Sequence, residues 1–131
     1  MTLATVEPDG QPLAGNLFVA AKDDLSLVFT AGARSRHSLA LMAHPRAAVT
    51  VYRETWDWAT LQGVQMEGRV EHLAVGPTRE AAWRLFLEKF SFASSHADEI
   101  SRSEFYRFVP RWVRLLDHNV EFGYRVEARL N

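Results

Sequence analysis

The sequence predicts one mainly β domain, an antiparallel β-barrel with two helices packed on its outside. Runs of apolar, β-branched and aromatic residues are separated by short turn-forming stretches, which is typical of sequential antiparallel strands. The two helical segments stand between strands without forming a regular strand–helix–strand crossover. No linker, repeat or low-complexity segment divides residues 1–131, so we expect a single domain.

The first third of the chain is rich in predicted strands. Pro8-Asp9-Gly10-Gln11 places Pro and Gly where turns favour them, so its flanks predict a hairpin. A second turn at Lys22-Asp23-Asp24 precedes a run of apolar residues. The strands expected here are residues 3–7, 12–20 and 25–30.

The rest of the chain alternates helices and strands. A polar loop at 32–37 leads into a short helix, 38–44, which Pro45 ends. Strands follow at 47–53 and 61–73, and Gly76-Pro77 opens a helix over 78–90. Residues 92–103 are polar and expected to be mobile, before strands at 104–116 and 121–130, with Pro110 as a bulge or edge marker.

Composition excludes several classes of protein. The formal net charge of -1 offers no field to attract nucleic acid or acidic membranes. The absence of cysteine excludes disulfides, thiol catalysis and iron–sulfur sites. No apolar run approaches the ~20 residues of a membrane span, and the N-terminus does not resemble a signal peptide. We therefore expect a cytoplasmic protein that binds neither nucleic acid nor membrane.

Most catalytic and metal-binding motifs are also missing. None of the five histidines pairs with another at helical metal-ligand spacing, so we expect no metal site. Gly63 and Gly68 have P-loop spacing, but Arg69-Val70 follow where Lys and Ser or Thr are required. Among the tryptophans, Trp56 and Trp58 are interpreted as surface or interface anchors, and Trp112 is the best candidate for a ligand wall.

The informative segment runs from Phe29 to Ser38. A strand ends, a loop brings Ser35 together with Arg34 and Arg36, and a helix begins, so unpaired helix N–H groups could join them at a phosphate site. From the residues alone, a plain N-cap with solvated arginines is about as good an interpretation.

At this point the sequence resembles the pyridoxamine-phosphate-oxidase-like flavoprotein superfamily, most closely its YhbP-like branch. That family has Ser-Arg-Lys before the short helix, where this chain has Ser35-Arg36-His37. Three further motifs match in order: Gly15-Asn16-Leu17-Phe18, Gly63-Val64-Gln65-Met66-Glu67-Gly68 and, loosely, Asp117-His118-Asn119-Val120-Glu121-Phe122-Gly123.

The resemblance implies an FMN-binding split β-barrel that works as a homodimer, with the cofactor site at the subunit interface. The FMN phosphate would be held by Ser35, Arg36 and His37. The flavin ring would be contacted by Asn16, Leu17, Phe18, the backbone of Phe29 and Thr30, Gly63, Gln65 and, from the partner subunit, Trp112. Strand alternation puts Gln65 on the outside and Val64 and Met66 in the barrel interior.

The implied activity is an oxidoreductase that relays electrons from NAD(P)H through FMN to a small-molecule acceptor. Two alternatives stay open: a flavin-binding or sensing module without turnover, or the same barrel binding haem or a deazaflavin. The chain departs from the family at His37, because an imidazole is a weaker phosphate ligand than a fixed positive charge. It also has no clear match to the arginine cluster that binds pyridoxal phosphate in true oxidases.

Overall fold

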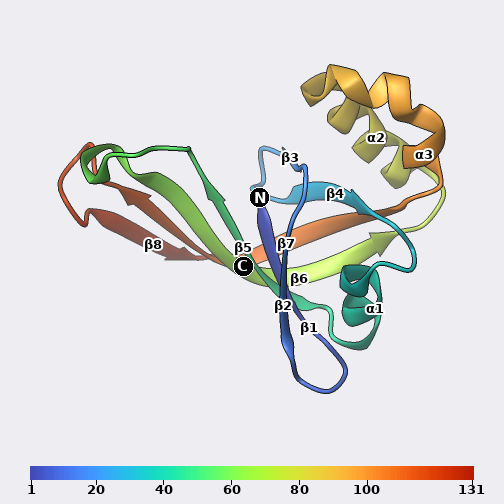
Figure 1. The fold of residues 1–131 in the computed structure, drawn as a ribbon, viewed down its shortest axis with the longest axis horizontal. Helices are drawn as coiled ribbons and strands as arrows, with labels where there is room; N and C mark the ends of the chain where they lie inside the picture. The colour runs from blue at the N-terminus through green and yellow to red at the C-terminus, as the bar shows by residue number, and fades with distance from the viewer.

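The computed structural model describes the whole chain, Met1–Asn131. The strands are β1 (Thr2–Val6), β2 (Pro12–Asn16), β3 (Ala20–Ala21), β4 (Leu27–Ala31), β5 (Arg46–Tyr52), β6 (Gln62–Leu73), β7 (Glu104–Asp117) and β8 (Arg125–Arg129). The helices are α1 (Arg36–Ala43), α2 (Pro77–Lys89) and α3 (Ala97–Ser101), with 3₁₀ turns η1 (Trp58–Thr60) and η2 (Ser91–His96). Every strand pair is antiparallel and the helices lie outside the sheet (Figure 1), which confirms the predicted fold class.

The strand order explains why the sheet curls into a split barrel. Seven strands follow the path β2-β1-β5-β6-β7-β4-β3, and β8 adds to β7 beside it. The end strands β2 and β3 are consecutive in the chain and are joined only by residues 17–19. Because three residues span at most about 10 Å, the two edges of the sheet must meet. The single strand expected at 12–20 is therefore wrong: its first part pairs with β1 and its last part with β4.

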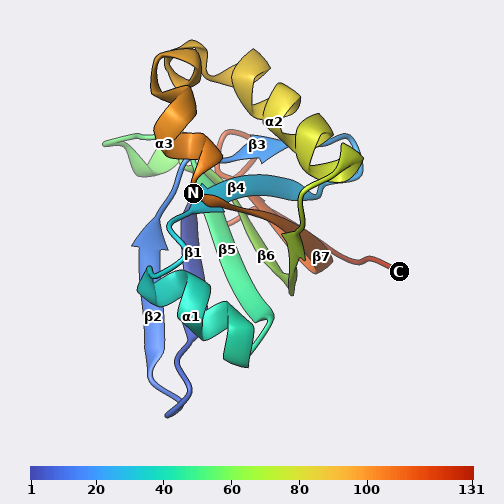
Figure 2. The ribbon, with the colours of Figure 1, turned by 90° about the vertical axis from the view of Figure 1, so that its right-hand side faces the viewer.

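The inner face of the curled sheet carries the core. Leu3, Phe29 and Phe108 have no exposed surface, and the ring of Phe29 stacks on Tyr106 at 5.3 Å between centroids. Helix α1 lies against β1 and β2 (Figure 2) and contributes Leu41 to this core. The opposite side of the sheet is called the outer face below; α2 covers part of it over Val28, Leu73 and Phe105, and the part around Gln65 is exposed.

Residues 92–103 are more regular than their polar composition predicted. They form η2 and α3, so three helices lie outside the barrel instead of the two expected. The chain folds back along α2 and buries Ala93 against Phe86, with Ile100 packed on the same cluster. Long-range packing, which local polarity does not reveal, therefore orders this segment.

The C-terminal hairpin also differs in detail from expectation. Pro110 marks a bulge, one of its two predicted roles: Gly68 pairs with Pro110 and Glu67 with Trp112, so β7 carries one extra residue. The last strand begins at Arg125 rather than at 121. The residues before it form a turn in which the Oδ1 atom of Asp117 accepts a hydrogen bond from the Asn119 backbone (2.9 Å).

Beyond the barrel, the far ends of β5 to β8 project as an arm, which we define as residues 50–65 and 112–129 (Figure 1). At its tip, the ring of Phe122 lies 6.3 Å from that of Trp58 and 4.7 Å from that of His118. Trp56 is 96% exposed and Trp58 78% exposed, so their predicted surface position is confirmed. No helix of this fold is long and apolar enough to cross a bilayer.

Candidate functional site

The loop between β4 and α1, together with the first turn of α1, holds the hydroxyl and guanidinium groups that the sequence singles out; α1 begins at Arg36 rather than at the expected residue 38, so Arg36 and His37 are helical. Ser35 is the N-cap of α1, and its Oγ atom accepts a hydrogen bond from the Ser38 backbone (3.2 Å). The Ser38 hydroxyl donates in turn to the carbonyl of Gly32 (2.8 Å). The first turn of α1 carries no acidic side chain. The helix N-terminus therefore keeps its partial positive charge, which suits an anion.

Arg36 is held at the loop surface by Glu7, which lies just after β1. Its Nε and Nη2 atoms donate to the two carboxylate oxygens at 2.9 and 2.7 Å. This bidentate contact lowers the pKa of Glu7 and raises that of Arg36. Because the pair is exposed, it contributes little to stability, and a stronger anion can replace Glu7.

His37 points beneath the loop rather than outward with Arg36. Its ring packs so closely on Gly15 of β2 that any Cβ atom there would overlap the Cε1 and Nε2 atoms. The Nδ1 atom is buried and has no hydrogen-bond partner. A buried unpartnered nitrogen is costly, and it usually marks a site where a water or ligand belongs.

The predicted ring-binding segment lies at the seam between β2 and β3. Asn16 is exposed and accepts a hydrogen bond from the Thr2 hydroxyl (3.0 Å). Leu17 points inward and packs on the core. Phe18 is 61% exposed and contacts the rings of Phe90 and Phe92. The three residues thus face three different surroundings.

Phe29 and Thr30 have a free backbone edge at the same seam. Strand β3 pairs only with Leu27 and Val28, whereas β7 pairs with β4 as far as Ala31. The β3-facing edge of β4 therefore has no strand partner at Phe29 and Thr30. The Phe29 side chain is fully buried, so only its backbone could contact a ligand.

Gly63, Gln65 and Trp112 share the outer face of the sheet. Gln65 is exposed and Met66 is buried, which confirms the predicted orientation of β6. The Oε1 atom of Gln65 accepts a hydrogen bond from Nη1 of Arg114 (3.2 Å). The guanidinium of Arg114 also lies 5.1 Å from the centre of the Trp112 ring. Arg114 thus connects the two predicted residues.

The strand register places two of the predicted residues, Asn16 and Gln65, in one polar row that crosses six strands. Each member pairs with the next, in the order Asn16, Thr2, Thr50, Gln65, Arg114 and Glu127. A hollow of about 530 Å³ opens beside Asn16 and is also lined by Tyr52 and Trp56. Strand alternation could have placed Thr2, Thr50 and Arg114 on the outer face, but their register is not visible in one sequence.

Seven of the eleven predicted site residues therefore form two groups on different faces of the chain, and the other four, Leu17, Phe18, Phe29 and Thr30, lie at the seam. The loop group is Ser35, Arg36 and His37, and the outer-face group is Asn16, Gly63, Gln65 and Trp112. No hydrogen bond or ion pair joins a member of one group to a member of the other. No three His, Asp or Glu side chains come together as metal ligands.

The curled sheet, its open seam and a helix N-terminus suited to an anion define a split-barrel protein. Comparison with known families supports this class. The family model described as pyridoxamine 5'-phosphate oxidase matches residues 1–117. The chain therefore belongs to this family, and the family resemblance seen in the sequence is confirmed. Its placement in the YhbP-like branch stays a prediction.

The match to curated relatives covers only part of each relative's length. Pyridoxine/pyridoxamine 5'-phosphate oxidases of Thermosynechococcus vestitus and Cupriavidus necator are each 41% identical over 75 residues, which is 56% of this chain and 33% of theirs. The chain thus matches about a third of the length of these relatives.

Solved structures share the fold at low identity. A haem-binding protein of Mycobacterium smegmatis has a TM-score of 0.81 at 20% identity, covering 98% of this chain and 51% of that protein. A pyridoxamine 5'-phosphate oxidase-related, FMN-binding protein of Nostoc punctiforme has a TM-score of 0.68 at 17% identity, covering 99% and 85%. These likenesses establish the architecture only.

Proposed function

We propose that the protein binds FMN as a homodimer, with each flavin held between the loop group of one subunit and the outer-face group of the other. The observation that carries this proposal is the separation of the two groups within one chain. A two-fold dimer would bring each group against its complement in the partner. The exposed aromatic residues of the arm support it, because apolar patches of this kind mark interfaces.

The loop group fits a phosphate. The first turn of α1 lacks acidic residues, Ser35 caps it, and Arg36 is bound only by an exposed carboxylate. Phosphate would replace Glu7 on Arg36, since charge-assisted bidentate contacts to a dianion are stronger. His37 would act from beneath, where its Nδ1 atom has no protein partner.

The seam and the outer face would hold the ring. Asn16, Leu17 and Phe18 would line one side, with the free backbone edge of Phe29 and Thr30. Within the outer-face group of one subunit, Gln65 would bond the polar edge of the flavin and Trp112 would cover the ring.

Bound FMN supplies two-electron transfer, so the proposed activity is an electron relay from NAD(P)H to a small-molecule acceptor. The proposed location is the cytoplasm, because a chain without cysteine suits a reducing compartment.

Mixed dimers test the shared site directly. Arg36→Ala and Trp112→Ala homodimers should each lose FMN affinity at both sites. A heterodimer of the two variants should regain one tight site, because it pairs a native loop group with a native outer-face group. If each site lay within one chain, mixing would restore nothing, and the shared-site proposal would fail.

The phosphate contact has its own test. Arg36→Ala should weaken FMN binding by roughly ten- to a hundred-fold and leave riboflavin binding nearly unchanged, since one charge-assisted contact contributes ~1.5–3 kcal/mol. Glu7→Gln is the matched control: it keeps Arg36 and frees it, so FMN should bind as tightly or more tightly. Equal losses for FMN and riboflavin would place Arg36 outside the phosphate site.

Haem is the second candidate ligand, because the haem-binding protein of Mycobacterium smegmatis shares this fold with a TM-score of 0.81. The absorption spectrum of the purified protein separates the candidates, since oxidised flavin, deazaflavin and haem absorb differently. Bleaching of bound flavin by NADH or NADPH would distinguish an oxidoreductase from a flavin-binding module without turnover.

A further inference from the structure

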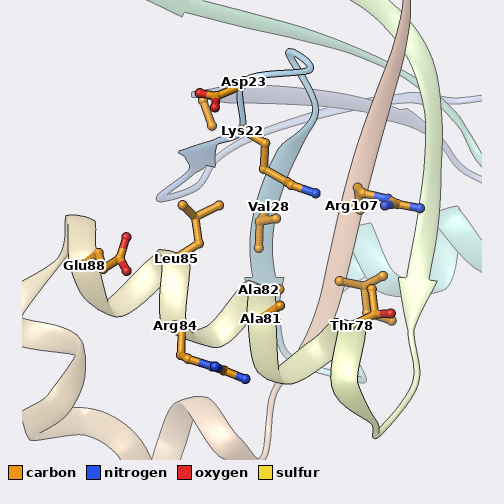
Figure 3. Close-up of a pocket in the computed structure, with 12 residues that line it drawn as sticks. Lys22, Asp23, Val28, Thr78, Ala81, Ala82, Arg84, Leu85, Glu88 and Arg107 are labelled. Atoms are coloured by element: carbon orange, nitrogen blue, oxygen red, sulfur yellow. The ribbon is translucent and has the colours of Figure 1, made fainter.

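A separate cleft lies between helix α2 and the barrel. It has a volume of about 490 Å³ and is bounded by α2, the turn between β3 and β4, and β7 (Figure 3). None of its lining residues belongs to the loop group or to the outer-face group. Its volume falls within the ~300–1,000 Å³ usual for small-molecule sites.

The floor and one wall of this cleft are apolar. Val28, Leu73 and Ala82 form the floor and are nearly fully buried, at 1%, 6% and 6% exposure. Leu85 and Ala81 extend the apolar surface along α2. An apolar body lying there would be removed from water on most of its surface, which favours binding.

The opposite wall carries positive charge. Figure 3 shows the Lys22 ammonium directed past Val28 toward β7, whereas the Arg107 guanidinium extends away from Val28. Lys22 forms no ion pair, whereas Arg107 binds Glu71 through Nε and Nη2 (3.0 and 2.6 Å) and keeps Nη1 without a partner. Lys22 is therefore an unpaired cation on this wall, and a negative charge placed beside it would be favoured.

None of the neighbouring carboxylates forms an ion pair with the Lys22 ammonium. Asp24 does not line the cleft, and its Oδ1 atom already accepts hydrogen bonds from the backbone and hydroxyl of Ser26 (2.9 and 2.5 Å). These bonds lower the pKa of Asp24, and attraction to Lys22 and Arg107 adds to the effect. Asp23 lies at the outer end of the turn, and Glu88 lies farther along α2 (Figure 3).

We propose that this cleft binds a small amphipathic anion, an aromatic body with one carboxylate. The aromatic body lies over Val28 and against Leu85. The carboxylate binds the Lys22 ammonium. This site is independent of the FMN proposal, because it shares no residue with it.

The test uses 2-naphthoate as the probe and maps backbone amide shifts of the full chain by NMR. Shifts should concentrate at Val28, Leu85 and the β3–β4 turn. Lys22→Met should weaken binding about ten-fold, as expected for loss of one charge-assisted contact. Ala81→Trp should block the cleft while leaving Lys22 in place. Arg102→Gln removes an exposed charge just after α3, outside the cleft, and is the matched control.

Neutral 2-naphthalenemethanol provides the ligand control and should bind at least ten-fold more weakly than 2-naphthoate on the same reasoning. The proposal is overturned if 2-naphthoate shifts residues elsewhere, if Lys22→Met behaves like Arg102→Gln, or if the neutral analogue binds equally well. The amide spectrum of each variant also reports whether it is folded, and Lys22→Met tests the site even if Ala81→Trp disturbs α2.

Discussion

The barrel and the arm use the same long strands in opposite ways. In the barrel, inward-facing Val70 of β6 and Phe108 of β7 pair with each other and are buried. In the arm, Leu115 of β7 and Val126 of β8 also pair on that side of the sheet, yet they are 43% and 49% exposed. Strand alternation therefore sorts side chains to faces, but a face becomes a core only where a second layer covers it.

This difference predicts that the barrel and the arm contribute to different properties of the protein. The barrel supplies its own second layer by curling, with α1 packed at its end. The arm is covered only near the barrel: in its apolar row, Val51 and Val64 are partly buried against the core, whereas Leu115 and Val126 are 43% and 49% exposed. We expect core substitutions to lower the free energy of unfolding and arm substitutions to weaken association.

The largest expected effect is on the barrel. Phe108→Ala should lower the free energy of unfolding by about 3–5 kcal/mol, because it removes a fully buried ring and leaves a cavity. Chemical denaturation measures this loss. Phe122→Ala at the 71% exposed arm tip is the control and should cost under ~0.5 kcal/mol in the isolated subunit. Similar losses for both variants would remove the distinction between barrel and arm.

The next effect is on association through the arm. The native protein should sediment near twice the 14.9 kDa of one chain. Replacing Trp58 and Phe122 together by Ser should weaken the dimer by about 2 kcal/mol or more, since buried aromatic anchors dominate interfaces. Far-ultraviolet circular dichroism should remain native. A native protein that is monomeric at micromolar concentration would contradict the dimer and the shared site.

A smaller effect is expected where β2 meets α1. Gly15→Ala should destabilise the protein by roughly 1–3 kcal/mol, because the new methyl group overlaps the His37 ring and displaces it. Gly32→Ala is the matched control, since nothing lies within 4 Å of its added Cβ atom. Adding His37→Ala to Gly15→Ala should recover part of the loss. Without that recovery, the strain does not come from His37.

The smallest expected effect is that of low pH on the turn around Asp117 at the tip of the arm. Hydrogen bonds from Asn119 and Gln62 lower the pKa of Asp117 from its ordinary value of 3.8. A lowered pKa in the folded state means that the carboxylate stabilises the turn above the unfolded-state pKa and loses this effect as pH falls through the folded-state pKa. The Asn119 amide signal should therefore titrate with a midpoint below 3.8, and this step should vanish in Asp117→Asn. A midpoint at or above 3.8 would contradict the hydrogen-bonded turn.

The sequence predicted properties of single residues in the candidate site, but it did not predict which of these residues lie together. The sequence identified Ser35 as a possible N-cap, and alternation put Gln65 outside and Met66 inside. It could not show that Arg36 binds Glu7, because these residues are 29 positions apart. Nor could it show that Asn16 and Gln65 lie in one row, because that depends on the register of strands distant in sequence.

What the sequence determined by itself was local: the turn at Pro8–Gln11, the helix after Pro77, an irregularity at Pro110 that was a bulge or an edge, and the alternating faces of residues 63–68 on β6. These follow from backbone geometry and period-two alternation, which act over a few residues. Tertiary structure alone decided the break at residues 17–19, the helical order of residues 92–103 and the division of the site into two groups. Those features follow from closing the sheet and packing Ala93 on Phe86, so their free energy comes from contacts that no local pattern encodes.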